Sequence, residues 1–387
     1  MIRSMYSGIA GLKNFQTKLD VIGNNIANVN TFGFKKGRVT FQEAMNQTIS
    51  GATAAVEGRG GKNPLQVGLG SVTATIDSVQ TQASLQTTGR SLDLSINGDG
   101  FFVVQGPGGQ NLYTRGGNFY LDQAGTLVNG DGYRVQQFDN GVLEDITINA
   151  SGVLPAQTSS NITFSGNLSS SIADLTSEFS QQVKLVNDLG QESTYTATFS
   201  PGANANAWGY TLTDYSSGTA NVVGSGNVNV GGTNNVTLPG IAAPVTFDFT
   251  NVTNDAGEIS IQGVADGNRE GSIESFSVSQ TGVVNAVYSN GLVMPMASIS
   301  LASFNNPSGL VKAGNNLFQE SVNSGVANIG NVETIGGSIS AGTLEMSNVD
   351  LSEEFTEMIT AQRGFQANTR IITTSDQILE ELVNLKR

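Results

Sequence analysis

The sequence predicts a mainly β protein with a long α-helix at each end, on three observations. Apolar residues recur alternately three and four positions apart at both ends of the chain, which is the spacing of helices that pair as a coiled coil. Between the ends, short apolar runs are separated by Gly, Asn and Asp clusters typical of β-turns. The length, 387 residues, favours two or three domains at about 150 residues each.

We expect the β region to be nested, with an outer β domain inserted into a middle one. The middle domain would be built from two separate stretches of the chain, because the apolar pattern before the insertion resumes after it. The predicted parts are a helical coiled-coil domain (1–29 with 349–387), a connecting segment with an extra loop (30–78), a middle β domain (79–150 with 267–348) and an inserted outer β domain (151–266).

The N-terminal helix carries one apolar stripe that fits the a and d positions of a coiled coil. Its seam positions are Ile2, Met5, Ile9, Leu12, Gln16, Leu19, Gly23 and Ile26. Asn residues then accumulate, and because Asn favours caps and turns we expect the helix to end near Val29, before Gly33. An amphipathic helix that packs on its own core is the alternative interpretation of this stripe.

The C-terminal helix has the same alternation of four and three residues. Its seam positions are Leu351, Phe355, Met358, Gln362, Phe365, Thr369, Ile372, Asp376, Leu379, Val383 and Lys386. Asp350 or Ser352 can cap its first turn, in which Glu353 and Glu354 complement the helix dipole. The polar seam positions suit a contact that is shared with neighbouring molecules rather than closed within one chain.

The densest basic cluster, Lys35, Lys36 and Arg38, lies among aromatic residues. Such a cluster can indicate nucleic-acid binding. The net charge of −14 favours instead a local packing and ion-pairing patch. After it, Ser50–Gly61 is rich in Gly and Ala and is expected to form a loop that is flexible or ordered by a partner.

Two Asn-Gly and Asp-Gly clusters mark turns in the predicted middle domain. Asn97–Gly100 follows an alternating run, Ser91–Asn97, and precedes Phe101–Val104, which predicts a hairpin. Asn129–Gly132 has some features of a calcium loop, but the full spacing with a terminal Glu is missing, so a turn is favoured.

The predicted outer domain has Lys184 as its only basic residue between 151 and 266, and Ser, Thr, Asn and Gly dominate it. A stretch low in complexity, Gly224–Asn235, is expected to be a loop or a sheet edge. The apolar runs that predict strands are Val183–Val186, Tyr195–Phe199, Trp208–Leu212 and Val245–Phe249.

Composition excludes several classes of chemistry. The chain contains no Cys and no His, so thiol and imidazole catalysis, disulfides and Cys- or His-ligated metals are excluded. A two-carboxylate enzyme is an alternative with Asp93 and Asp99 as candidate acids, but both occupy predicted strand and turn positions. We therefore predict no catalytic residue, no cofactor-binding residue and no metal site. An adhesin or binding module built on residues 151–266 is a further alternative.

The charge and hydropathy patterns restrict the partners. A sequence pI near 4.4 argues against nucleic acid or an anionic membrane surface. No apolar run approaches 18 residues, which predicts no transmembrane helix. The first residues, Met1–Ser4, do not begin an apolar region of the kind found in signal peptides, so no cleaved signal peptide is expected.

Four separated stretches resemble the family of bacterial flagellar rod and hook proteins. Leu19–Lys35 (LDVIGNNIANVNTFGFK) is similar to the N-terminal signature of that family, and Ser347–Arg387 to its C-terminal signature. Ser91–Val104 and Tyr113–Val128 are similar to its shared β domain. Residues 151–266 match no motif and are taken as a variable outer domain. The signature residues of the first stretch are Asn24, Asn25, Asn28, Gly33 and Phe34.

The resemblance implies a structural subunit and not an enzyme. Within the family a large inserted β domain is a feature of hook proteins, which implies a subunit of the curved, flexible tube that transmits motor torque to the filament. The segment Gln47–Pro64 is similar to an extra segment of the distal rod protein, which is the alternative.

The resemblance also implies partners and a location. The main partner would be further copies of the chain in a helical homopolymer, together with rod, hook-cap and hook–filament junction proteins and the flagellar type III export apparatus. Nucleic acid, membrane insertion and cofactors are not implied, and the protein would reach the flagellar hook or basal body, outside the cell, without a cleaved signal peptide. The expected polymerisation contacts are Ile2, Met5, Ile9, Leu12, Leu19, Ile26, Leu351, Phe355, Met358, Gln362, Phe365, Ile372, Leu379 and Val383.

Overall fold

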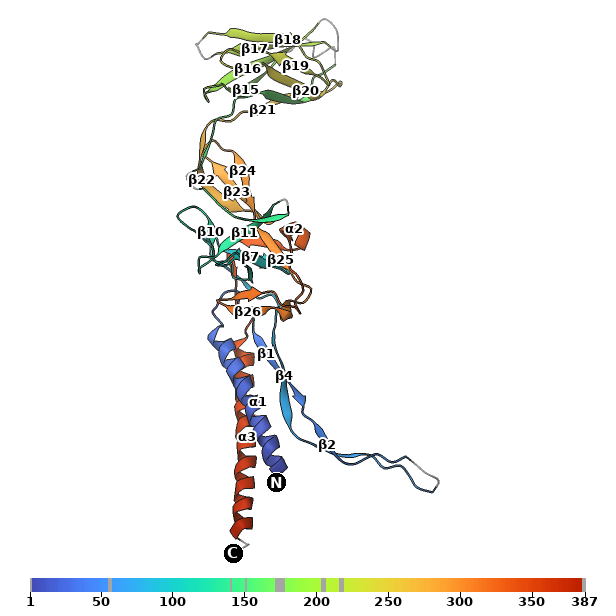
Figure 1. Cartoon of the computed structure of the whole chain (residues 1–387). Coiled ribbons are helices and arrows are strands. Elements are labelled where there is room, and N and C mark those ends of the chain that lie inside the picture. The colour runs from blue at the N-terminus through green and yellow to red at the C-terminus, as the bar shows by residue number, and fades with distance from the viewer. Residues whose placement is uncertain are drawn as a thin grey trace. The chain divides into compact units, whose positions relative to one another are not determined.

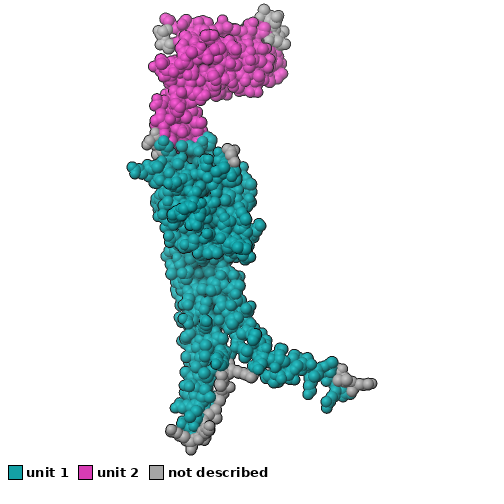
Figure 2. Space-filling view, viewed as in Figure 1, with its two compact units in different colours: residues 1–149, 277–285, 295–387 teal, residues 150–276, 286–294 magenta. Residues whose placement is uncertain are grey.

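The computed structural model describes residues 2–54, 58–139, 141–149, 152–170, 178–202, 207–215 and 219–384. The chain forms two compact units (Figure 2). Unit 1 contains residues 1–149, 277–285 and 295–387, and unit 2 contains residues 150–276 and 286–294. The predicted fold class, mainly β with long helices at both ends that contact each other, is confirmed.

The two terminal helices, α1 (Ile2–Ala27) and α3 (Leu351–Asn384), lie side by side (Figure 1). Helix α1 ends where predicted, at a run of Asn residues, and the Asn28 side chain donates to the Asn24 carbonyl in its last turn. Asp350 caps α3, because its Oδ1 accepts the Ser352 and Glu353 amides at 2.8 and 3.4 Å. No helix of the described residues is long and apolar enough to cross a membrane.

A long two-stranded β-ribbon follows α1 in the chain. It is formed by β1 (Gly37–Glu43) paired with β4 (Ser71–Ser78), followed by β2 (Asn46–Ser50) paired with β3 (Leu65–Gly68). The sequence predicts a connecting segment with an extra loop over residues 30–78 and short strands only from Leu65 onward, so β1 and β2 were not predicted. Every residue of β2 and β3 is exposed.

The β body of unit 1 is a ten-stranded sheet that covers an aromatic core. Phe101, Tyr113, Phe304 and Phe318 pack in it edge to face, with ring centroids 4.8–5.8 Å apart. Its main path is β26 (Val311–Gly314), β27 (Leu317–Gln319), β8 (Asn111–Thr114), β7 (Phe101–Gln105), β11 (Arg134–Asp139), β10 (Leu127–Val128) and β9 (Tyr120–Leu121). Off this path lie β12 (Val142–Asp145), β25 (Ser300–Ser303) and β28 (Asn328–Asn331). A short 3₁₀ helix, Pro307–Gly309, connects β25 to β26. A short α-helix, α2 (Val332–Ile335), follows β28 and leads out of this sheet.

The hairpin predicted around Asn97–Gly100 is wrong in its pairing. The chain turns there, with Gly98 and Gly100 at positive φ, but the two flanking strands join different sheets. Strand β6 (Leu94–Asn97) pairs with β29 (Ser338–Ala341), whereas β7 joins the ten-stranded sheet. A second pair is formed by β5 (Leu85–Thr87), which precedes β6 in the chain, and β30 (Thr343–Glu345), which follows β29. A turn signal fixes a reversal of the chain but not the partner of each strand.

Unit 2 contains two four-stranded sheets that share one hydrophobic core. Phe164, Phe247 and Phe249 of one sheet and Phe199 and Tyr210 of the other form a cluster of buried rings. The first sheet has the order β19 (Thr233–Val236), β20 (Val245–Thr253), β14 (Asn161–Asn167), β21 (Gln262–Ala265). The second has the order β15 (Phe179–Val186), β16 (Glu192–Pro201), β17 (Trp208–Asp214), β18 (Asn221–Asn227). All four predicted strands are present, and the low-complexity stretch contributes edge strands.

A further four-stranded sheet has the order β13 (Val153–Leu154), β22 (Gly271–Val278), β23 (Val283–Tyr288), β24 (Val293–Ser298). The division between the units cuts across its strands, because residues 277–285 group with unit 1 and residues 286–294 with unit 2. Most of this sheet lies within residues 267–348, which the sequence predicts to be part of the middle β domain because their apolar pattern matches that of the strands before residue 150.

Candidate self-assembly site

Small side chains form the contact between α1 and α3. A Cβ added at Gly11 would lie 2.5 Å from the Asn368 side chain, and one added at Gly364 would lie 2.4 Å from the Phe15 ring. A larger residue at either position would force the Asn368 side chain or the Phe15 ring to move, so glycine lets the two helices approach closely. The helices are antiparallel, because early residues of α1, such as Gly8, meet late residues of α3, such as Ile372.

The intramolecular contact lies one residue away from the predicted seam. Helix α1 faces α3 through Gly8, Gly11, Phe15, Lys18 and Asn25, which also recur three and four or seven residues apart. Lys18 pairs with Glu357 at 3.2 Å, and Asn25 bonds to Glu354. The heptad spacing is present, but its phase differs by one residue, because small and polar side chains together with Phe15 form the contact in place of the predicted apolar stripe.

Apart from Ile372, which meets Gly8, the predicted seam residues that the structure describes border the helix contact or face water. Those that are half-buried are Met5, Leu12, Leu19, Ile26, Met358, Ile372 and Leu379. Those that are exposed are Ile9, Gln16, Gly23, Leu351, Phe355, Gln362, Phe365, Thr369, Asp376 and Val383. The Ile2 side chain and Lys386 lie outside the described part of the structure.

A second face of α1 packs on the ribbon. The Asn14 amide donates to Ser71 Oγ at 2.8 Å, and Thr73 Oγ1 donates to Asn14 Oδ1 at 3.4 Å. Gly70 lies against Ser7 and Ala10, where an added Cβ would be 3.2 Å from the Ala10 Cβ. Helix α1 is thus covered on one side by α3 and on another by β4.

Helix α3 leaves large apolar side chains in solvent. Phe355 is 49% exposed, Ile359 57% and Val383 70%. Leu351, Phe355 and Ile359 are four residues apart and so lie on one face of the helix. Burying one such side chain fully is worth about 1.5–3 kcal/mol, and an exposed apolar surface of this kind marks an interaction site.

The exposed apolar residues continue on the ribbon. Met45 is 77% exposed, and both strands of the outer pair carry large apolar side chains. The exposed set of the ribbon is Phe41, Met45, Ile49, Leu65, Val67, Val72 and Ile76. An isolated two-stranded ribbon is at best marginally stable in water, so further packing is needed to hold it.

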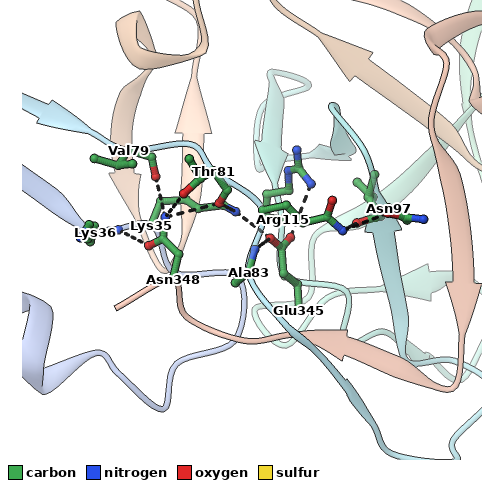
Figure 3. A network of polar contacts seen from close by, with 12 residues as sticks. Lys35, Lys36, Val79, Thr81, Ala83, Asn97, Arg115, Glu345 and Asn348 are labelled. Carbon is green, nitrogen blue, oxygen red and sulfur yellow. Dashed lines mark hydrogen bonds and ion pairs between the residues drawn. The ribbon is translucent and has the colours of Figure 1, made fainter. Parts of the chain in front are cut away.

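A buried ion cluster joins the helix pair to the β body (Figure 3). Glu345 Oε1 accepts from the Lys35 ammonium at 2.7 Å and from the Ala83 amide at 2.9 Å. Glu345 Oε2 lies 3.5 Å from the Arg115 guanidinium. Lys35 also donates to the Thr81 carbonyl at 2.7 Å. The carboxylate therefore ties together four segments that are far apart in the sequence.

Burial of the cluster changes its electrostatics. The side chains of Lys35 and Glu345 are fully buried. Burial lowers the pKa of Lys35, because desolvation penalises the ammonium, while the Glu345 carboxylate opposes this shift. Burial also lowers the pKa of Arg115. A carboxylate is essential here because two cations are removed from water together.

The predicted ion-pairing patch is confirmed. Besides the Lys35 contact, Lys36 pairs with Glu353 at 2.8 Å and Arg38 with Asp77 at 3.5 Å. The partner carboxylates could not be named from the sequence. Glu345 and Glu353 lie more than 300 residues away along the chain, and no local pattern connects them.

Among the signature residues, Asn25 is the one whose side chain joins α1, Gly37 and α3. Its amide donates to the Gly37 carbonyl at 2.9 Å and to Glu354 Oε1 at 3.1 Å, and its Oδ1 accepts the Gly37 amide at 2.9 Å. The Asn25 side chain thus pairs with both the amide and the carbonyl of Gly37, as a neighbouring strand would, and it also bonds to Glu354 of α3. Asp would lack both donors, so Asn is the residue that this position requires.

Two other signature positions have structural roles near the cluster. Gly33 has φ of 70°, and an added Cβ would lie 2.6 Å from the Gly116 amide. Phe34 is buried, and the Lys312 ammonium lies 5.2 Å from its ring centroid. The sequence analysis did not single out Asn348, which accepts the Lys36 amide at 2.7 Å and donates to the Val79 carbonyl at 2.8 Å (Figure 3).

The turn at Asn129–Gly132 is confirmed. Asn129 Oδ1 accepts the amides of Asp131 and Tyr133 at 3.0 and 2.9 Å, which is an Asx-turn. Among the residues that the structure describes, no group of three or more acidic side chains could hold a metal ion.

The fold and this site define a structural subunit whose end helices pair and leave apolar residues uncovered. Three family models match the chain: "Flagella basal body rod protein" over residues 5–35, "Flagellar hook protein FlgE/F/G D1 domain" over residues 95–170 and "Flagellar basal body rod FlgEFG protein C-terminal" over residues 340–385.

Named relatives match from end to end. The chain is 38% identical to the flagellar hook protein FlgE of Borreliella burgdorferi and 38% identical to the flagellar basal-body rod protein FlgG of Bacillus subtilis, with 100% of both chains covered in each case. A crystal structure of Helicobacter pylori FlgE2 shares the fold, with a TM-score of 0.51 and 13% identity over 67% of this chain and 100% of that one. The chain belongs to the flagellar hook and basal-body rod family, whose members are structural, self-assembling and not enzymes.

We expect Glu345→Gln to destabilise unit 1 by about 3–5 kcal/mol, because it leaves two buried cations without a carboxylate. Lys35→Met should cost clearly less, since Glu345 keeps Arg115. Urea unfolding followed by far-UV circular dichroism measures both. Trp208, the only Trp, is buried in unit 2, and its fluorescence separates the unfolding of that unit. Equal losses for the two variants would contradict this account.

We expect the helix pair to lose stability as the pH rises above 4.5. Burial raises the pKa of Glu354, with Glu357 and Glu353 adding to it, while Asn25 and Lys36 oppose the shift. A carboxyl group with a raised folded-state pKa stabilises fully below its unfolded pKa, near 4.5, and this stabilisation is lost as the pH rises through the folded value.

Glu354→Gln should remove this part of the pH dependence. Urea unfolding by circular dichroism between about pH 4 and 7 measures it. Glu380→Gln, an exposed position on the same helix, is the control and should keep the wild-type slope. Identical slopes for the two variants would refute the role of Glu354.

Proposed function

We propose that the chain is the subunit of the flagellar hook and polymerises into its curved, flexible tube. The observation that carries the proposal is the full-length similarity to hook-named relatives in Borreliella burgdorferi and Treponema pallidum, and the inserted β unit with its own core is consistent with it. In the proposed tube, residues 1–29 and 349–387 form the inner wall, the middle β domain lies around it, and residues 151–266 lie outermost.

The insertion alone does not separate hook from rod. The rod-named relative in Bacillus subtilis aligns over 389 residues with all of both chains covered, so its length is similar. The expectation that rod proteins lack such an insertion therefore does not hold for this relative. The distal rod subunit is the second candidate, and the ribbon that contains residues 47–64 favours it.

The proposed driving force of assembly is burial of the apolar side chains that one chain leaves in water. Phe355, Ile359 and Phe365 on α3 are 49%, 57% and 37% exposed, so each would contribute roughly 1 kcal/mol when a neighbour covers the exposed part. Several such side chains together can offset the loss of translational and rotational freedom on association. A head-to-tail contact of this kind generates a helical filament when its rotation does not close a ring.

The proposal includes the expected partners. Rod subunits at one end, cap and hook–filament junction proteins at the other, and the type III export apparatus before assembly would each contact the terminal segments or the β body. Low charge suits subunits that slide on their neighbours, since few ion pairs would lock one register; charged residues are only 13% of the chain.

Phe355→Asp or Phe365→Asp should abolish polymerisation and leave the β body folded, because each places a charge in a surface that neighbours would bury. Sedimentation of the purified protein under polymerising conditions measures the loss. Gln366→Asp changes an exposed polar residue of the same helix and should polymerise like the wild type. Polymers of normal yield from both Phe variants would exclude this surface from the assembly contact.

Cryo-electron microscopy of the isolated appendage tests the hook proposal. Gold-labelled antibodies against residues 178–202 of the outer domain should decorate a short curved tube outside the cell envelope in the wild type. Labelling restricted to the straight rod would refute the hook assignment and support the rod alternative. A strain that lacks the chain serves as the control, and it should retain a rod without a hook.

A further inference from the structure

A polar hollow of about 610 Å³ lies in unit 1 beside the segment that follows α1. Its size falls in the range of ligand-binding pockets, about 300–1,000 Å³. The wall includes Asn28, Asn118, Asn129, Asp131, Asn315 and Asn316. Half of the residues around it are Asn, which is far more than an ordinary surface would place together.

The walls of the hollow are held rigidly. The turn between β26 and β27 places Asn315 and Asn316 at φ of 49° and 59°, a left-handed conformation that non-glycine residues seldom adopt. Asn316 donates to the Phe32 carbonyl at 3.0 Å and accepts from Thr114 Oγ1 at 3.0 Å. With the Asx-turn at Asn129, this makes a preformed site, and a partner loses little free energy to ordering it.

The chemistry of the wall suits a main chain with small side chains. Asn amides can both donate and accept, and the groups that the wall's own hydrogen bonds leave unused match the alternating donors and acceptors of an extended peptide. Asp131 adds a carboxylate whose Oδ1 accepts from Asn315 at 3.1 Å. Across the described ranges, no Lys or Arg lies within ion-pair distance of Asp131. A cation in a glycine-rich segment would complete the site.

The tip of the ribbon supplies this chemistry. This tip has the sequence Gly-Arg-Gly-Gly-Lys over Gly58–Lys62, and all five residues are exposed. Neither cation forms an ion pair with any residue that the structure describes. Glycine exposes the backbone to the Asn amides, and the two cations complement Asp131.

The occupant must come from another molecule. The ribbon begins at Gly37, which Asn25 holds next to the end of α1 and hence near the hollow. The stretch that contains β1 and β2, Gly37–Ser50, extends for roughly 45 Å at about 3.3 Å per residue, and Gly58 comes after its end. The tip is therefore far from the hollow of its own chain, whereas a homopolymer presents the same hollow on neighbouring copies.

We propose that this hollow receives the tip Gly58–Lys62 of a second copy of the chain, with Arg59 and Lys62 facing Asp131. The inference rests on self-assembly of the family and not on the choice between hook and rod. It assigns to the ribbon a specific receptor on its neighbour.

Charge exchange tests the proposal in the full-length chain. Asp131→Lys, and separately the pair Arg59→Glu with Lys62→Glu, should each raise the protein concentration needed for polymerisation by roughly tenfold or more, because like charges then face each other. All three changes together should restore polymerisation to within about threefold of the wild type. Asp139→Lys, an exposed position outside the hollow, is the matched control and should behave as the wild type.

Disulfide trapping in cells gives a second measurement. It reports whether the two positions lie close together and does not depend on the charges of their side chains. The chain has no Cys, so Arg59→Cys combined with Asp131→Cys introduces one pair of thiols per contact. Mild oxidation of assembled appendages should produce a ladder of covalent multimers on non-reducing gels. Either single variant, and the pair Arg59→Cys with Asp139→Cys, should give no ladder.

The outcomes distinguish this inference from the proposed function. If the wild type forms curved tubes but the triple variant is not rescued and no ladder appears, the receptor is refuted while the hook assignment stands. If the ladder appears in straight rods, the receptor stands and the hook assignment falls. If the wild type forms no polymer and the Arg59→Cys with Asp131→Cys variant gives no ladder, both proposals are overturned.

Discussion

The buried carboxylate of Glu345 is the constraint on which the rest of unit 1 depends. It lies at the end of β30, six residues before α3, and it binds Lys35, which follows α1. The exit of one terminal helix and the entry of the other are therefore fixed at the same place. Arg115 ties this place to the β body. Because a buried carboxylate between two cations tolerates little displacement, the antiparallel pairing of α1 and α3 starts from a defined point.

Beyond that point, one face of each helix makes the contact within the chain and another face stays exposed. Gly11, Gly364 and Asn25 make the contact within the chain, where close approach and specific hydrogen bonds matter more than apolar area. The large apolar side chains, such as Phe355 and Ile359, stay outside. A chain that buried them internally would gain stability as a monomer and would lose the driving force for assembly. The exposed ribbon fits the same logic, since it is too thin to be stable without further packing.

Much of the fold was predictable because local chemistry determines it. The helix bounds follow from Asn accumulation and from the Asp350 cap, and the strands of unit 2 follow from period-two alternation. Pairing was not predictable where it is remote. Asn97–Gly100 turns the chain, yet β6 finds its partner about 240 residues later, at Ser338–Ala341. Strand β2 was missed because all of its residues are exposed, so no alternation of apolar and polar positions marks it as a strand.

The sequence by itself determined that two end helices flank a β body, that Lys35, Lys36 and Arg38 pair with acids, and that Asn25 belongs to a signature stretch. These conclusions rest on spacing, composition and motif, all of which are local. Only the tertiary structure decided which face of each helix is used within the chain and which carboxylate each cation meets. The physical reason is that a heptad pattern fixes the period of a stripe but not its phase against a partner, and the phase was set by glycines that allow close approach.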